Sequence, residues 1–87
     1  MKHLKENDKI ETAYGKMKVV EFKDNTDAGW YDIAETELLD QEAQVSDKVN
    51  ISDTVVIEHT KYTVTDIEIR HFTDKEAYLQ LYRYNKE

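Results

Sequence analysis

The chain has 87 residues, which is enough for one domain and too few for two independent hydrophobic cores. It contains 36% charged residues and carries a formal charge of −7, yet six tyrosines, two phenylalanines and one tryptophan supply a core that disordered chains lack. The absence of cysteine excludes disulfides and thiolate chemistry, and no apolar run is long enough for a membrane span. We therefore expect a soluble cytoplasmic protein.

The first predicted element is a β-hairpin made of residues 9–12 and 16–23, joined by a tight connection that contains Gly15. In its longer strand the apolar alternation slips by one residue. Met17 and Val19 share one face, and Val20 and Phe22 then take over. Such a slip predicts a β-bulge or a sharp bend.

A turn at 24–29 precedes a short third strand at 30–33. This turn offers Asp24, Asn25, Thr26 and Asp27 in the manner of a calcium loop. No glutamate follows at the position that would complete an EF-hand, so an ordinary turn is the preferred interpretation.

Residues 34–46 contain no glycine or proline and are rich in Glu, Gln, Leu and Ala, a composition that favours a short helix. Asp32 and Glu35 suit an N-terminal cap pair. The apolar stripe is imperfect, so an irregular crossover is the alternative to a helix.

A second hairpin, 54–58 with 61–71, follows the crossover and shows the same slip of alternation. It matches the first hairpin at a constant offset of 45 residues; for example, Asp8 matches Asp53 and Val19 matches Val64. The last segment, 77–84, fits either a strand or a helix that begins with a capping box. Its alternating tyrosines favour a strand.

These elements predict a mostly β fold with one short helix, in a single domain spanning residues 1–87. Two β-meander units, with a pseudo-repeat at 7–33 and 52–84, would form a small barrel or a two-sheet sandwich. The acidic helical or irregular crossover at about 34–46 would join them.

No motif points to catalysis. There is no glycine-rich phosphate loop, nucleophile elbow or zinc spacing, and His3, His59 and His71 have no partner fixed by the sequence. We therefore expect no enzyme activity, no catalytic residues, no metal and no cofactor.

The acidic charge is concentrated in residues 24–60, which hold ten acidic residues and one lysine, a formal charge of −9. Such a segment is unsuited to direct nucleic-acid or membrane binding, but it can attract a basic protein partner. The leading hypothesis is a non-enzymatic interaction protein whose acidic side chains contact that partner, with two aromatic residues as anchors. The predicted contact residues are Asp32, Glu35, Glu37, Asp40, Glu42 and Asp47, with Trp30 and Tyr31.

The most specific form of this hypothesis is a nucleic-acid mimic that inhibits a DNA- or RNA-binding enzyme, as phage anti-defence proteins do. A monomer or a homodimer fits it. The alternatives are a small β assembly module of a phage particle or other complex, which would use its edge strands, and, third, a small-molecule-binding domain. The acidic stretch can also be a solvated face that only keeps the chain soluble.

Overall fold

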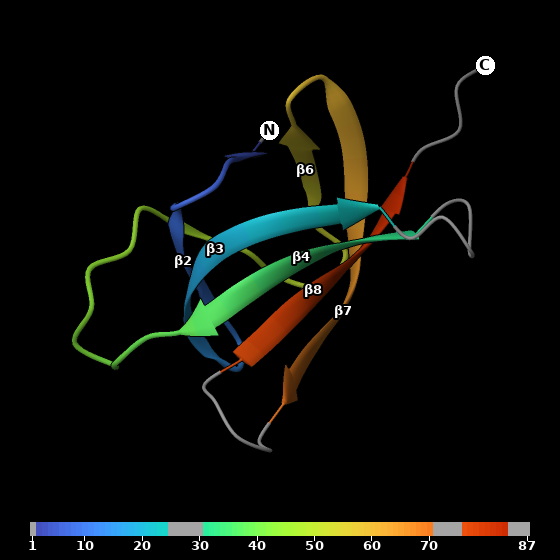
Figure 1. The fold of residues 1–87 in the computed structure, drawn as a ribbon. Helices are drawn as coiled ribbons and strands as arrows, with labels where there is room; N and C mark the ends of the chain where they lie inside the picture. The colour runs from blue at the N-terminus through green and yellow to red at the C-terminus, as the bar shows by residue number, and fades with distance from the viewer. Residues whose placement is uncertain (1, 25–30, 71–75, 84–87) are drawn as a thin grey trace.

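The computed structural model describes residues 2–24, 31–70 and 76–83, and every regular element within these ranges is a β-strand (Figure 1). The expectation of a mostly β protein is thus confirmed. In chain order the strands are β1 (Lys2–Leu4), β2 (Lys9–Thr12), β3 (Gly15–Asp24), β4 (Tyr31–Leu38), β5 (Asp47–Lys48), β6 (Thr54–Ile57), β7 (Thr60–Arg70) and β8 (Glu76–Arg83).

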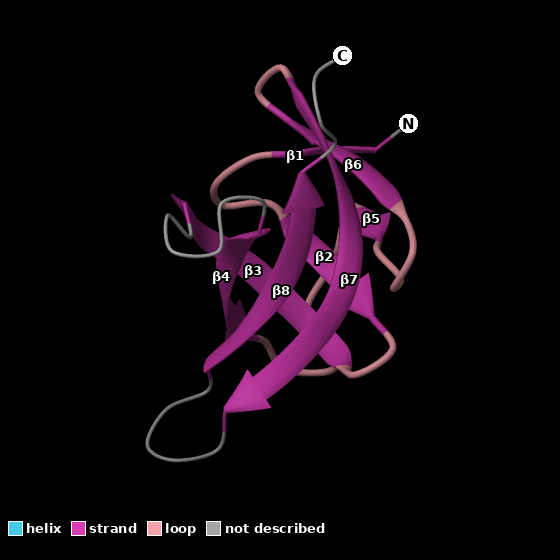
Figure 2. Cartoon of the chain, turned by 90° about the vertical axis from the view of Figure 1, so that its right-hand side faces the viewer, coloured by secondary structure: helices cyan, strands magenta, loops and turns pink. Residues whose placement is uncertain are grey.

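All eight strands belong to one open, mixed sheet in the order β1-β6-β7-β8-β4-β3-β2-β5. The long strands are antiparallel, as β7 and β8 show in Figure 2, whereas the two edge strands, β1 and β5, pair in parallel with β6 and β2. The predicted closed barrel or two-sheet sandwich is therefore wrong. The edge strands β1 and β5 are not paired with each other in the sheet, and the Lys2 ammonium group donates to the carbonyl oxygen of Lys48.

The predicted helical crossover is also wrong. Residues 34–38 continue strand β4, and residues 39–46, the connecting segment, contain no helix. Ala34 and Thr36 are buried, while Glu35 and Glu37 point outward, which is the two-residue period of a strand. Pairing with β3 on one side and β8 on the other satisfies the backbone of β4, and this outweighs the helical propensity of its side chains.

Both slips of alternation mark real bulges. The register of β3 against β4 shifts between Val19 and Glu21, and that of β7 against β8 shifts between Val64 and Asp66. The last segment is a strand, as its tyrosines predicted. A bulge increases the local twist and bends a strand. The two long strands therefore curve, which is how one sheet encloses a core.

The strand pattern of residues 2–38 recurs at residues 47–83 with an offset of 45. Each of β1 to β4 begins 45 residues before β5 to β8, respectively. Backbone hydrogen bonds follow the same offset, because Val19 donates to the Asp8 carbonyl and Val64 donates to the Asp53 carbonyl. We call β1 to β4 the first half and β5 to β8 the second half.

The sheet order reads the same from both ends once the halves are interchanged, so the halves are related by an approximate two-fold axis. The axis passes between Ala34 of β4 and Leu79 of β8. These two residues are register partners, and they are also equivalents at the offset of 45. The edge strand of each half pairs with the hairpin of the other half.

One hydrophobic cluster fills the inner face of the sheet and draws side chains from both halves. Several of its members occupy equivalent positions, and all of these are buried. The equivalent pairs are Leu4 with Val49, Ile10 with Val55, Met17 with Tyr62, Val19 with Val64 and Ala34 with Leu79. The core is therefore built twice from the same positions.

A pair of left-handed residues, Asn7 (φ 74°) and Ser52 (φ 79°), occupies equivalent positions before the two hairpins. A left-handed conformation costs an L-residue about 1–2 kcal/mol, and glycine avoids this cost at the expense of roughly 0.5–1 kcal/mol of chain entropy. We expect Ser52→Gly to raise the free energy of unfolding by about 0.5 kcal/mol, measured by urea denaturation. Ser52→Ala, which keeps the strain, should give no gain.

Candidate functional site

The acidic residues predicted to share one helical surface occupy separate places. Glu35 and Glu37 lie on the outer face of β4, whereas Asp32 of the same strand is buried on the inner face. Asp40 and Glu42 are exposed in the connecting segment. The strand period decides this separation, because Asp32 is an even number of residues from the buried Ala34 and Thr36. Asp32 is thus not available to a partner at the surface.

The three other predicted contact residues are Asp47, Trp30 and Tyr31. Asp47 is exposed on edge strand β5, and its carboxylate accepts a hydrogen bond from the backbone N–H of Lys48 at 2.7 Å. Trp30 lies outside the described residues. Of Tyr31 only the backbone is placed, at the start of β4 opposite Tyr82. The role of Trp30 and Tyr31 as anchors stays a prediction.

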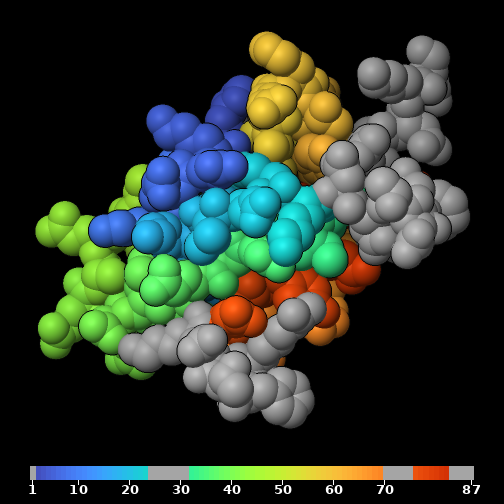
Figure 3. Space-filling view, in the orientation of Figure 1, coloured from blue at the N-terminus to red at the C-terminus, as the bar shows by residue number. Residues whose placement is uncertain are grey.

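The pairing of four long strands assembles carboxylates from distant parts of the sequence on the outer face of the sheet. Glu21 of β3 is the register partner of Glu35, and Glu37 is the register partner of Glu76 on β8. Glu68 of β7 lies opposite Tyr78, whose hydroxyl donates to it. We call this set the carboxylate face: Glu21, Glu35, Glu37, Glu68 and Glu76. In Figure 3 the atoms of β3, β4 and β8 adjoin on one side of the molecule.

Two lysines of β3 lie within the carboxylate face. The Lys23 ammonium is 3.1 Å from the Glu35 carboxylate, and that of Lys18 is 3.8 Å from Glu37. These side chains remain between one third and somewhat more than half exposed, so each pair contributes little to stability. In the described part of the chain, no basic side chain pairs with Glu21.

On the carboxylate face, glutamates of neighbouring strands lie opposite each other and are exposed to solvent. Glutamates directly opposite each other on neighbouring strands destabilise a sheet, by roughly 0.2–1 kcal/mol for each pair. Two such pairs, Glu21 with Glu35 and Glu37 with Glu76, occur side by side on the exposed face. The ion pairs of Glu35 with Lys23 and of Glu37 with Lys18 are partly exposed, so they offset only part of this repulsion. The opposed glutamate pairs are the strongest indication that this face has a role other than stability.

Sequence reasoning missed Glu21, Glu68 and Glu76 because their proximity depends on strand register. The only signal was the slip at Val20, which returns Glu21 to the outer face after Val19 has pointed inward. Glu68 and Glu76 join the face through pairing of β7 with β8 and of β8 with β4. Such long-range pairings are not encoded in local spacing.

The connecting segment is attached to the start of β3. The Lys16 ammonium donates to the carbonyl oxygens of Gln41 and Ala43, at 2.5 and 2.8 Å, and the Leu39 N–H donates to the Lys16 carbonyl at 2.8 Å. The Lys16 ammonium group is thus bonded to backbone carbonyl oxygens of the connecting segment. The side chains of the neighbouring Asp40 and Glu42 are exposed.

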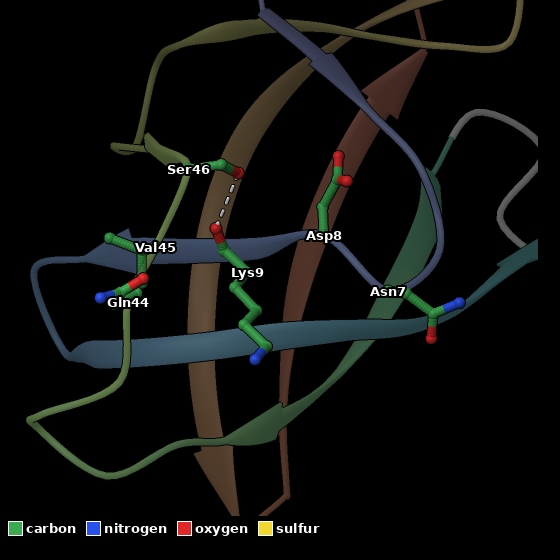
Figure 4. Close-up of a pocket in the computed structure, with 6 residues that line it drawn as sticks. All are labelled: Asn7, Asp8, Lys9, Gln44, Val45 and Ser46. Atoms are coloured by element: carbon green, nitrogen blue, oxygen red, sulfur yellow. Dashed lines mark hydrogen bonds between the residues drawn. The ribbon is translucent and has the colours of Figure 1, made fainter.

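An open depression of about 340 Å³ lies where the connecting segment meets the start of β2 (Figure 4). The Ser46 hydroxyl donates to the Lys9 carbonyl at 3.1 Å and joins the two walls. In Figure 4 the amides of Asn7 and Gln44 point away from each other. The polar groups do not converge, so the depression has no arrangement that selects a small ligand.

The histidines and the candidate calcium turn give no metal site among the residues that the structure describes. His3 on β1 and His59 in the β6–β7 turn are both exposed, and His71 lies outside the described ranges, as do residues 25–29 of the turn. Within those ranges no three His, Cys, Asp or Glu side chains are grouped to hold a metal ion.

Tyrosines of the second half divide between the core and the surface. Tyr62 is buried, whereas Tyr78 and Tyr82 are half-buried on the outer face, and Tyr84 lies outside the described ranges. The Tyr62 hydroxyl donates to the buried Asp32 carboxylate at 2.9 Å and joins β7 to β4 across the boundary between the halves. This buried contact ties the Asp32 carboxylate to the second half.

Removal of the Tyr62 hydroxyl should destabilise the protein. A hydrogen bond to a buried charged group contributes about 1–3 kcal/mol, and its loss leaves the Asp32 carboxylate less well solvated. We expect Tyr62→Phe to lower the free energy of unfolding by that amount in urea denaturation. Tyr78→Phe is the matched control, since it removes a tyrosine–carboxylate hydrogen bond that is exposed, and it should cost less than about 1 kcal/mol. Equal losses would contradict the assignment.

Asp53 lies at the start of the second hairpin and is held by two partners. Its carboxylate lies 2.7 Å from the Lys2 ammonium and accepts a hydrogen bond from the Asn50 N–H at 2.8 Å. The hydrogen bond from Lys2, and then that from Asn50, lower the pKa of Asp53 below its ordinary value of 3.8. This contribution to stability is therefore present above about pH 4 and is lost as the pH falls through the folded-state pKa.

The pH dependence of stability should reveal this contact. As the pH falls below about 4, wild-type protein should lose stability more steeply than Asp53→Asn, by less than about 1 kcal/mol because both groups are partly exposed. Lys2→Met should remove most of the same slope, and the double variant should add little to either single one. A slope that persists in Lys2→Met would contradict the role of the ion pair.

Comparisons with protein-family models, curated proteins and solved structures give no match for this chain. Among the described residues, no helix has the length and apolar character needed to cross a membrane.

Proposed function

We propose that the protein is a non-enzymatic interaction protein that presents the carboxylate face to a basic surface of a protein partner. The observation that carries this proposal is the placement of Glu21 opposite Glu35 and of Glu37 opposite Glu76 on one exposed face. A basic partner would remove the repulsion between these carboxylates. Binding would thus recover free energy that the isolated protein lacks.

The charge pattern defines what kind of partner fits. Glu35 and Glu37 lie about 6.8 Å apart along β4, and neighbouring strands lie about 4.8 Å apart, so the acidic groups form a grid. Lys18 and Lys23 interrupt the grid along β3. A partner with arginine or lysine side chains spread over a flat surface fits this pattern. Its encounter with the protein would be accelerated by charge and weakened by salt.

The finer hypothesis of nucleic-acid mimicry requires that the partner's basic surface also binds DNA or RNA. Assembly through the edge strands receives less support, because β1 has three residues and β5 has two. Short edges limit the pairing of a further strand. Assembly through the edge strands would therefore oppose docking through the carboxylate face.

The test compares two variants that each lose four negative charges, at different places on the surface. The face variant carries Glu21→Gln, Glu35→Gln, Glu37→Gln and Glu76→Gln, and the control carries Glu6→Gln, Glu42→Gln, Asp47→Asn and Glu58→Gln. Each serves as bait for proteins from a cell lysate at low salt. We expect wild type and the control to retain a common basic protein, and the face variant to lose it by at least about tenfold, roughly 1.4 kcal/mol.

Elution of the captured protein with salt or with nucleic acid then distinguishes charge-driven docking from nucleic-acid mimicry. Elution of that protein by added salt supports charge-driven docking, and elution by double-stranded DNA at constant ionic strength supports mimicry. Equal retention by all three baits would contradict the proposal, as would loss from the control alone, which would move the site to the connecting segment and β5.

The free energy of unfolding gives an independent measure of the repulsion between carboxylates on this face. Glu21→Gln removes one of the two repelling pairs and leaves the Lys23–Glu35 ion pair intact. We expect it to raise the free energy of unfolding by about 0.2–1 kcal/mol while it weakens partner binding. If Glu21 stabilised the fold, Glu21→Gln would instead lower the free energy of unfolding.

A further inference from the structure

The boundary between the two halves has the form of an interface between two separate molecules. Three strand pairs cross it: β4 with β8, β1 with β6 and β2 with β5. The chain itself crosses between the halves only in the connecting segment. The approximate two-fold axis at Ala34 and Leu79 gives this boundary the symmetry of an isologous dimer.

We propose that this boundary is a recognition surface for a second copy of the chain, on which two copies exchange halves. The first half of one chain would pair with the second half of the other, and the same contacts would form twice. The connecting segment would serve as the hinge. This inference concerns the inner boundary of the sheet and is independent of the function proposed for the carboxylate face.

The hinge has the properties that such exchange requires. It has eight residues and no helix or strand, and it is attached to the first half through Lys16 and Lys9. The Lys16 contacts hold residues 39–43 against the first half of the same chain, so they persist when the second half belongs to another copy. The Ser46–Lys9 contact adjoins β5 and would then form between the two copies, so the closed and exchanged forms differ mainly in the path of residues 44–46.

Two buried side chains determine which halves pair. Asp32 of the first half bonds to Tyr62 of the second half at 2.9 Å. At the offset of 45 the equivalents are Ala77 and Met17, so the contact has no polar counterpart on the other side of the axis. If two first halves paired, Asp32 would face Met17 of the second copy and would lose its hydroxyl donor.

The consequence is selectivity between two similar halves. A buried polar pair that fixes register or oligomeric state is the best-attested use of such groups in protein interiors. Asp32 and Tyr62 therefore direct each first half to a second half, whether it lies in the same chain or in another copy. The Lys2–Asp53 ion pair, which also joins the two halves, acts in the same direction.

Introduced cysteines test the exchange, because the natural chain has none. Full-length chains carrying Glu35→Cys are mixed with chains carrying Tyr78→Cys, unfolded together, refolded and oxidised with oxidised glutathione. These positions are register partners across the boundary, so a disulfide between two chains forms efficiently only when the halves have exchanged. Glu21→Cys with Tyr78→Cys gives the background, since β4 separates these residues.

We expect the 35–78 cross-linked dimer to exceed the background at least about tenfold, and to increase with protein concentration during refolding as mass action requires. Mixing the same chains without unfolding them should give background only. A cross-linked fraction equal to background after joint refolding would overturn the proposal.

A second pairing tests the selectivity residues. If two first halves paired, Glu35 would lie opposite Ile33 of the second copy, because Ile33 is the equivalent of Tyr78 at the offset of 45. Chains with Glu35→Cys and Ile33→Cys should therefore cross-link at background level. Adding Asp32→Ala and Tyr62→Met, which copy the equivalents in the other half, should raise this cross-link several-fold. No rise in a variant shown to be folded by circular dichroism would contradict the role of the Asp32–Tyr62 pair.

Discussion

The antiparallel pairing of β4 with β8 is the interaction on which the rest of the structure depends. It joins the two halves at the middle of the sheet, and its register places Ala34 opposite Leu79. From this centre β3 and β7 extend outward on opposite sides, and each leads to its own hairpin. A shift of one residue would turn every buried side chain of β4 toward solvent, so the core depends on this single register.

Curvature explains how one open sheet can enclose a core without a second layer. The bulges after Val19 and Val64 occupy equivalent places in the two long strands, where they bend both sides of the sheet toward the same interior. Short edge strands complete the enclosure, and Leu4 and the residue equivalent to it, Val49, close the core from each end. The same shortness protects the edges from pairing with other chains.

The electrostatic character of the surface follows from the same architecture. Pairing of distant strands brings carboxylates together, while the strand period sends Asp32 inward to Tyr62. The symmetry of the backbone is not matched by symmetry of charge. Lys18 and Lys23 lie on β3, whereas the equivalent positions on β7 are Thr63 and Glu68. One backbone arrangement therefore carries two halves with different charges.

The sequence by itself determined the β character, both hairpins, both bulges and the final strand, because each leaves a local trace in alternation and turn residues. The helix expected in residues 34–46 failed because composition reports intrinsic propensity, whereas β4 is held by partners on both sides. Only the tertiary structure decided that Asp32 is buried and that Glu21, Glu68 and Glu76 join Glu35 and Glu37. The physical reason is register, since which strands pair, and at which residue, is a long-range property that local spacing does not encode.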